Sequence, residues 1–228
     1  SKIDLDKTML IQIPALAWVK EGKLYKRILF TDNGKKEVVI QQIDNHRILC
    51  SDSEIKSYFA FPLCSIDVKS TVLRKLLEYY NSIYYMKTDP FEAILITILS
   101  QGRTGEATRK AFYTLCKNIP VLSPEAIIKI GENKLRDLIK SAGPYKAKYI
   151  TEMCKYIIEN CIDLAKLERY SSLRIIKILS RLPGIGIKTA ACVAVYAYLR
   201  DDVFPIDTHF FRVSNRIGPV SYTHLTLP

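Results

Sequence analysis

The sequence lacks any run of 18 or more apolar residues, and its apolar segment at residues 9–18 is interrupted by Gln12 and Pro14. Because a membrane-spanning helix needs about 20 apolar residues, we predict no membrane span. The chain does not open on a signal peptide. Its six cysteines show neither metal-ligand spacing nor the pattern of a secreted disulfide framework. These absences predict no metal site here and an intracellular protein, in the cytoplasm or nucleoid or, in a eukaryote, the nucleus.

Acidic residues are fewer than basic residues in this chain. The chain has 23 Asp and Glu against 34 Lys and Arg, a formal net charge of +11. Because each basic side chain near a phosphate releases condensed counterions, this balance favours a polyanionic partner, with nucleic acid as the first candidate. A basic chain that is simply soluble is the alternative on composition alone. With 228 residues, 48% of them hydrophobic, the chain can form one large domain or two modest ones.

The pattern of apolar residues changes near Asp67. Before it, short β-branched and aromatic runs alternate with turn signals, and residues 24–30 and 37–42 are expected to pair as a hairpin. After it, apolar residues recur at helical spacing, and about eight helices are expected. We therefore predict an α+β protein, with a small antiparallel β-rich domain in residues 1–66 and a mostly α-helical domain in residues 67–218.

Local signals divide the helical region into elements. Asp89, Pro90 and Glu92 supply an N-cap, a proline at the first helical position and a capping-box glutamate. They predict a helix from Pro90 to about Ser100. The other signals are starts at Ser123–Pro124 and Ser172–Leu173, and stops at Gly131 and Gly143–Pro144.

Two predicted helices flank a hairpin that contains Gly184 and Gly186. Glycines allow the backbone to turn tightly and to approach a phosphate closely. The N–H groups of residues 185–188, at the start of the following helix, carry partial positive charge toward such a phosphate. A Gly-x-Gly pair also occurs in ordinary helical hairpins, so the pair alone is weak evidence. We interpret the segment as a DNA-binding hairpin without sequence preference.

A second segment strengthens this interpretation. Residues 182–190 (LPGIGIKTA) are followed, after a proline-containing loop, by residues 206–213 (IDTHFFRV). Together they resemble the helix-hairpin-helix and Gly/Pro-Asp loop of the endonuclease III superfamily of DNA glycosylases. The resemblance extends from about Lys69 to about Gly218. The β-rich front end more weakly resembles the extra N-terminal domain of the oxidised-guanine glycosylase branch.

This resemblance implies a chemistry for two residues. In the superfamily, the lysine matched by Lys188 marks the bifunctional members, and the aspartate matched by Asp207 is the catalytic carboxylate. A lysine partly withdrawn from water at a helix N-terminus can attack the sugar C1′ as an amine, and an ionised aspartate can stabilise the charge that develops as the base leaves. We expect a bifunctional DNA glycosylase and AP lyase of base excision repair, which removes an oxidised base and cleaves the strand by β-elimination through a lysine Schiff base.

The sequence also allows two other functions. A monofunctional DNA glycosylase would use water in place of the lysine, and a non-catalytic helix-hairpin-helix module would only bind DNA. Lys188 argues against the first and Asp207 against the second. The expected partner in the favoured interpretation is double-stranded DNA with damaged bases or abasic sites, bound by a monomer.

The resemblance also marks residues that contact DNA. Enzymes of this class flip the target nucleotide and fill the hole left in the duplex. Gly102 stands where relatives usually carry Asn or Gln for this purpose, so Gln101 and Arg103 become the candidates. Cys192, four residues after Lys188, matches a base-contacting cysteine of the oxidised-guanine branch, with a small buried residue as the alternative. The residues expected at the DNA backbone are Leu182, Pro183, Gly184, Ile185 and Gly186, whereas Tyr79, Tyr80, Tyr84 and Tyr85 are interpreted as core and helix end.

The end of the chain is unlike the rest. Residues 219–228 resemble translated sequencing-adapter DNA, so we predict a non-native tail and a natural protein that continues past Gly218. In relatives, the region that follows holds helices that complete a second lobe and often four cysteines that bind an iron–sulfur cluster. We therefore expect no cofactor within residues 1–218, and an iron–sulfur cluster, where one exists, in the region that follows.

Overall fold

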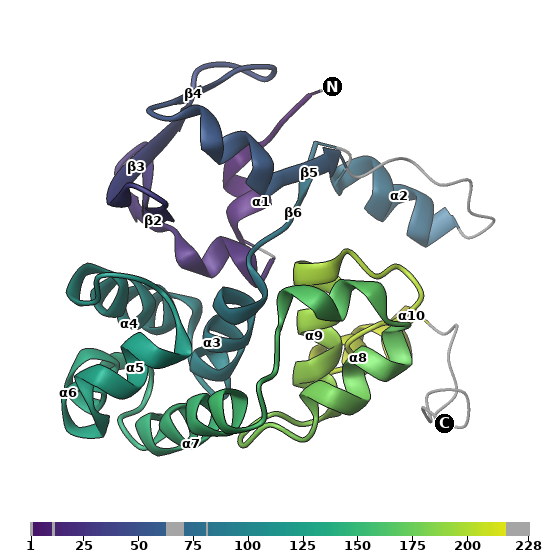
Figure 1. The fold of residues 1–228 in the computed structure, drawn as a ribbon. Coiled ribbons are helices and arrows are strands. Elements are labelled where there is room, and N and C mark those ends of the chain that lie inside the picture. The colour runs from purple at the N-terminus through teal and green to yellow at the C-terminus, as the bar shows by residue number, and fades with distance from the viewer. Residues whose placement is uncertain (1, 11, 63–70, 81, 218–228) are drawn as a thin grey trace.

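The computed structural model describes residues 2–10, 12–62, 71–80 and 82–217. Its first part is a four-stranded antiparallel sheet in the order β1-β2-β3-β4 (Figure 1). The predicted hairpin is formed by β2 and β3, which pair from Leu24 opposite Gln41 to Thr31 opposite Gly34. The strands are β1 (Val19–Glu21), β2 (Leu24–Thr31), β3 (Gly34–Gln42) and β4 (Ile48–Cys50), and β5 (Phe59–Pro62) and β6 (Tyr84–Met86) form a second, two-stranded sheet.

Helices make up most of the remaining chain, which confirms the α+β class. The described helical region has nine α-helices rather than about eight, because Gly131, with φ +75, both ends α5 and begins α6. The α-helices are α1 (Leu5–Leu10), α2 (Thr71–Tyr80), α3 (Pro90–Ser100), α4 (Gly105–Asn118), α5 (Pro124–Ile130), α6 (Glu132–Leu138), α7 (Lys146–Glu159), α8 (Ser172–Leu179), α9 (Ile187–Tyr198) and α10 (Thr208–Ile217), with 3-10 turns η1 (Pro14–Ala17), η2 (Ser53–Tyr58), η3 (Lys140–Ala142) and η4 (Ala165–Arg169).

The helix α3 lies at the centre of the molecule and has the bounds predicted for it (Figure 1). Asp89 caps it by accepting hydrogen bonds from the N–H groups of Phe91 and Glu92, and burial raises the pKa of Asp89. The capping box predicted for Glu92 is wrong. Its carboxylate instead forms an ion pair with Arg27 of β2 at 2.5 Å and accepts from the Thr88 hydroxyl, because a buried cation from the sheet competes for it.

The N-terminal sheet and the helices share one hydrophobic core. It continues from Trp18 through Ile94 of α3 to the residues of α9 that face α3. The guanidinium of Arg109 on α4 donates to three main-chain carbonyls within residues 9–18. The two parts are therefore packed together. The domain boundary predicted near Asp67 lies outside the described residues.

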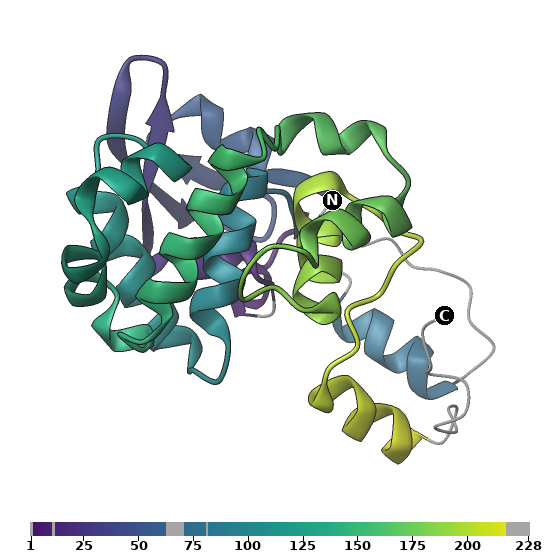
Figure 2. The ribbon, with the colours of Figure 1, turned by 60° about the horizontal axis from the view of Figure 1, so that its bottom comes forward.

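Two helices, α2 and α10, project from the same side of the molecule (Figure 2). α2 has no buried residue, and in α10 Ser214 is the one buried residue among the side chains described. The predicted tail, residues 219–228, lies outside the described residues. Among those described, no helix has the length and apolar character that crossing a membrane requires.

Candidate nucleic-acid interface and active site

The predicted hairpin lies between α8 and α9. Gly184 has φ +79, a left-handed conformation that is costly for a residue with a side chain. A Cβ at this position would come within 3.3 Å of the Cβ of Tyr149 on α7. The N–H of Ile185 donates to the carbonyl of Leu182 at 3.1 Å and closes the turn. Both the conformation and the space therefore require glycine at this position.

The N-terminus of α9 faces open space. Gly186 is the N-cap, with an extended backbone (φ −89) and no side-chain cap. An added Cβ at Gly186 would meet no atom within 4 Å. The first N–H groups of the helix, from Ile187 on, have no intrahelical partner, and the helix dipole adds partial positive charge there. This arrangement can hold an anion such as a phosphate.

Two of the predicted DNA-contact residues turn their side chains into the core. Leu182 is 2% exposed and Ile185 is 5% exposed. The prediction that the N–H groups of residues 185–188 all face a phosphate is wrong for Ile185, because closing the turn uses its donor. The hairpin therefore presents its main chain, rather than these two side chains, to solvent. Nearer the surface lie half-buried Pro183 and exposed Gly184 and Gly186.

Lys188, Cys192 and Asp207 come together beside this hairpin. Lys188 and Cys192 lie one helical turn apart on α9, which places the Lys188 side chain near the buried Cys192 thiol. Burial raises the pKa of the Cys192 thiol; the charge of Lys188 opposes this shift, and the Asp207 carboxylate adds to it. Both charged groups thus act on the same thiol. The structure brings together the predicted nucleophile, the predicted carboxylate and the predicted base-contacting cysteine.

The two charged groups of this cluster differ in their surroundings. The Oδ1 atom of Asp207 accepts a hydrogen bond from the N–H of Phe210 at 2.8 Å, so this half-buried carboxylate caps α10 in a fixed orientation. Lys188 is exposed, and the expectation that it is partly withdrawn from water is wrong, because the hairpin ends at the surface. An accessible amine and an oriented carboxylate that both act on the Cys192 thiol can support nucleophilic attack with stabilisation of a developing positive charge.

A pair of stacked tyrosines continues the same face of α9. Tyr196 lies one turn after Cys192, and its ring stacks on that of Tyr85 with centroids 5.5 Å apart and planes at 17°. The pair lines a cavity of about 360 Å³ that Phe204 and Pro205 also border, shortly before Asp207. Sequence reasoning missed Tyr196, although its spacing of four residues from Cys192 is the signal that could have found it.

The other predicted tyrosines have mixed positions. Tyr79, interpreted as core and helix end, is 59% exposed at the end of α2. It contacts Tyr80 edge to face, with ring centroids 5.0 Å apart. The core interpretation is therefore wrong for Tyr79, because its ring contacts only the edge of Tyr80 and the ammonium of Lys7 on α1 among the contacts described, and stays open to solvent.

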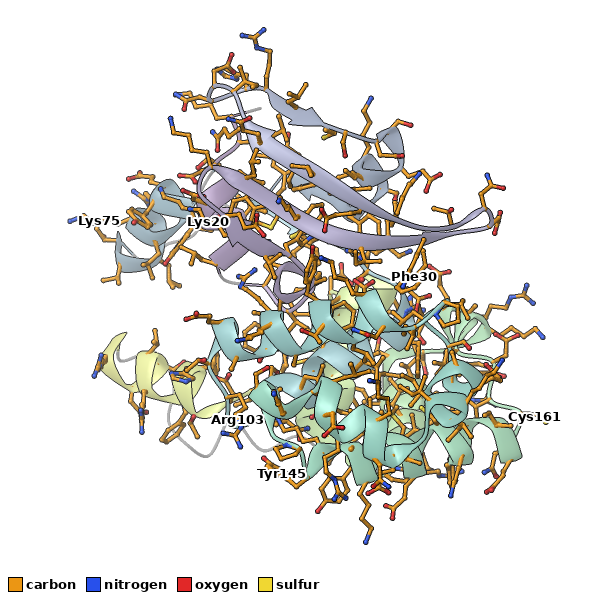
Figure 3. The ribbon with its side chains drawn as sticks, turned by 90° about the vertical axis from the view of Figure 1, so that its left-hand side faces the viewer. Lys20, Phe30, Lys75, Arg103, Tyr145 and Cys161 are labelled. Atoms are coloured by element: carbon orange, nitrogen blue, oxygen red, sulfur yellow. The ribbon has the colours of Figure 1, made fainter. Side chains whose placement is uncertain are left out.

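The loop between α3 and α4 is joined to the hairpin by Gln101. The side-chain Nε2 of Gln101 donates to the carbonyl of Gly184 at 3.3 Å and to the Thr189 hydroxyl at 3.2 Å. Gly102 has φ +62, a conformation open to glycine and, at some cost, to asparagine. Arg103 is exposed and lies beside Tyr145, with its guanidinium 5.9 Å from the ring centroid (Figure 3). Of the two candidates for filling the duplex, Arg103 is the one not bound to the hairpin.

A buried lysine on α7 holds the same loop from behind. Lys146 is 1% exposed, and its Nζ donates to the carbonyls of Leu99 and Gln101, each at 2.7 Å. Burial lowers the pKa of Lys146 to about 8, and the positive charge of Arg103 acts in the same direction. No local sequence signal identifies this residue, since its partners lie more than 40 positions away.

The described residues do not form a metal site. Among them, no three His, Cys, Asp or Glu side chains gather closely enough to hold a metal ion. Their cysteines are free thiols. An iron–sulfur cluster therefore does not fit the described part of the chain, and the region in which the resemblance places one lies outside it.

Comparisons with other sequences identify a family. The family model described as "HhH-GPD superfamily base excision DNA repair protein" matches residues 95–225. Endonuclease III of Thermotoga maritima is 33% identical over 138 residues, which cover 59% of each protein. The chain thus spans about three fifths of the length of that relative. Endonuclease III of Rickettsia prowazekii is 38% identical over 162 residues, covering 66% of this chain and 70% of that protein.

Solved structures share the fold. The apo form of the Clostridium acetobutylicum 8-oxoguanine glycosylase/lyase matches with a TM-score of 0.77 and 17% identity, covering 98% of this chain and 85% of that one. A non-covalent endonuclease III–DNA complex matches with a TM-score of 0.54 and 26% identity, covering 66% of this chain and 68% of that one. The first match includes the β-rich front end, in agreement with the resemblance noted for it.

Proposed function

Because the chain belongs to the HhH-GPD superfamily of base excision DNA repair proteins, we propose that it is a DNA glycosylase with lyase activity. The observation that carries this proposal is the cluster of Lys188, Cys192 and Asp207 beside a hairpin whose helix N-terminus is open to an anion. A phosphate held at that terminus would bring the neighbouring sugar to the amine and the carboxylate. The proposed partner is double-stranded DNA with damaged bases or abasic sites, bound by a monomer.

In the proposed reaction, the neutral amine of Lys188 attacks C1′ of the flipped nucleotide. The bond from C1′ to the base breaks, and its electron pair leaves with the base, which takes up a proton. The amine then loses a proton, the C1′–O4′ bond breaks, and the ring oxygen O4′ takes up a proton as the open-chain sugar becomes a protonated imine of the lysine. Removal of a C2′ proton then expels the 3′ phosphate, and water releases the lysine. Asp207 would stabilise the positive charge at C1′ and accept a proton.

The proposed substrate is an oxidised base. The stacked rings of Tyr85 and Tyr196 give the cavity that they line an apolar aromatic wall, one helical turn after Cys192 on α9, and such a wall favours a planar ring. The Clostridium acetobutylicum neighbour is an 8-oxoguanine glycosylase/lyase, an enzyme named for an oxidised base. Both observations support this substrate class for the present chain.

Borohydride trapping tests the nucleophile. On duplex DNA with 8-oxoguanine or an abasic site, reduction during turnover should join enzyme and DNA covalently. Lys188→Gln should lose trapping and strand cleavage while it retains DNA binding, because the hairpin binds through main-chain N–H groups. Lys134→Gln, at an exposed lysine of α6, is the matched control and should trap normally. Trapping of Lys188→Gln at the wild-type level would overturn the assignment and favour a monofunctional glycosylase or another nucleophile.

A further inference from the structure

The positive charge of this protein is concentrated around the hairpin. Residues 169–200 contain six Lys or Arg and no Asp or Glu, although the whole chain has 23 acidic residues among 228. This acid-free stretch includes α8, the hairpin and α9. The active-site proposal uses Lys188 from it and leaves the cations on α8 without a role.

Two of these cations, Arg174 and Lys177, lie on one side of α8, and Arg181 follows in the turn after it. The three are three and four residues apart, a spacing that on a helix places side chains next to one another, and all three line one hollow. All three are exposed, whereas Ile175 and Leu179 on the opposite side are fully buried. Together with half-buried Ile178, the three cations line a hollow of about 340 Å³. We call them the α8 basic face.

Among the described residues, no carboxylate pairs with this face. In the described part of the chain, none of the three cations lies within 4.0 Å of an acidic side chain, whereas Arg136 and Lys148 each pair with a glutamate of their own helix. Like charges at this spacing destabilise an isolated helix. The guanidinium of Arg174 lies 4.0 Å from the ring centroid of Tyr170, a contact that supports it without lowering its charge.

We propose that Arg174, Lys177 and Arg181 form a second phosphate-binding surface, which binds DNA backbone phosphates adjacent to the phosphate held by the hairpin. Arg181 precedes Gly184 by only three residues, so the face leads directly into the hairpin. At the rise of a helix, the seven-residue spacing from Arg174 to Arg181 corresponds to about 10 Å. This length matches roughly three base-pair steps along the duplex. The inference rests on the proposed DNA substrate and extends the surface that binds it.

Side chains that contact only phosphates position the DNA without reading its sequence. The α8 basic face should therefore raise affinity for every duplex and leave the chemical step unchanged. Each phosphate contact contributes a slope of about 0.9 to the dependence of log affinity on log salt concentration. Three contacts would steepen this dependence by up to about 2.7.

The first test replaces the three cations together, as Arg174→Gln, Lys177→Gln and Arg181→Gln, and measures affinity for a lesion-free 25-base-pair duplex from 50 to 200 mM salt. We expect at least a tenfold loss of affinity at 100 mM salt and a flatter salt dependence. The single-turnover rate of lesion cleavage at saturating enzyme should stay within twofold of wild type. The control carries Lys23→Gln, Lys129→Gln and Lys134→Gln, which remove the same charge from exposed positions on other elements.

The second test shortens the duplex on each side of the lesion in turn by three or four base pairs. On one side, shortening should lower wild-type affinity as much as the triple substitution does, and should have no further effect on the triple variant. The proposal would be overturned if the control variant lost as much DNA affinity as the triple variant. It would also be overturned if the triple variant kept the affinity and the salt dependence of wild type. A wild-type protein that fails to bind or to trap DNA would instead contradict the proposed function itself.

Discussion

The ammonium group of Lys146 donates a 2.7 Å hydrogen bond to the carbonyl of Gln101, and the side chain of Gln101 reaches across to the hairpin. One buried cation on α7 thus supports the loop after α3, and that loop is tied to the turn at Gly184 and to Thr189 beside Lys188. The loop and the hairpin are therefore connected through specific contacts.

Lys146→Met should loosen this connection. The carbonyls of Leu99 and Gln101 would lose their donor, at a cost of about 1–3 kcal/mol in the free energy of unfolding. Excision of a lesion in duplex DNA should slow about tenfold through misplacement of the loop. Denaturant unfolding and single-turnover kinetics measure the two effects. Lys148→Met, at an exposed neighbour whose partner is a surface glutamate, is the control, and an equal loss in that variant would contradict the role of Lys146.

The pH dependence of stability offers a separate check on Lys146. Its pKa is lowered to about 8 in the folded protein, against an ordinary value of 10.5. Between these values the unfolded chain binds more protons, so the contribution of this lysine to the free energy of unfolding rises with pH. The difference in stability between wild type and Lys146→Met should thus shift in favour of wild type from pH 8 to 10. A constant difference would mean that Lys146 keeps an ordinary pKa.

Asp207→Asn should separate base release from strand cleavage. Asparagine also caps helices, so α10 and DNA binding should persist. Loss of the negative charge should slow base release by about 10²-fold or more. On an abasic duplex no base has to leave, so this variant should retain more of its activity there than Lys188→Gln does. An equal loss on both substrates would contradict a role for Asp207 in stabilising charge at C1′.

Gly184 and Gly186 should respond differently to alanine. Gly184→Ala places a side chain at φ +79 and against Tyr149, and the conformation alone costs about 1–2 kcal/mol. Gly186→Ala meets open space and should change stability by less than about 1 kcal/mol. A bulky residue at Gly186 should weaken binding to all duplexes alike, because it covers the main-chain donors. Thermal melts and binding to lesion-free and lesion-containing duplexes measure these effects; selective loss for one lesion would contradict them.

The Arg27–Glu92 pair predicts strong destabilisation from single substitutions. Their side chains are 1% and 4% exposed, so removal of either one leaves a buried charge without its partner. Arg27→Met should lower the free energy of unfolding by about 3–5 kcal/mol, whereas the double variant Arg27→Met, Glu92→Leu should recover part of that loss. Denaturant titration of the two variants measures the difference. A double variant less stable than the single one would contradict the account.

Local patterns in the sequence predicted the β2–β3 hairpin, the bounds of α3 and the helix pair around Gly184 and Gly186. Each of these depends on neighbours within a few positions, such as Pro90 at a helix start. The paired segments at residues 182–190 and 206–213 likewise indicated that Lys188 and Asp207 belong to one site.

The contacts that sequence reasoning missed are those between distant segments. Glu92 has the spacing of a capping box, but Arg27 lies 65 positions earlier and takes its carboxylate. Lysine is usually a surface residue, and Lys146 is buried only because α7 packs behind α3. Ile185 belongs to a phosphate-binding pattern, yet its N–H donates to the carbonyl of Leu182 within the turn. Such competition for one donor or one carboxylate cannot be read from spacing alone.

The buried pair of Arg27 and Glu92 also limits how this fold can evolve. A lineage that deleted the N-terminal sheet would leave the carboxylate of Glu92 inside the protein without its cation, in contact with the Thr88 hydroxyl alone. The deletion would be tolerated only together with a replacement of Glu92 by an uncharged residue. A chimaera that exchanges the sheet must therefore either keep a cation opposite Glu92 or replace Glu92 as well.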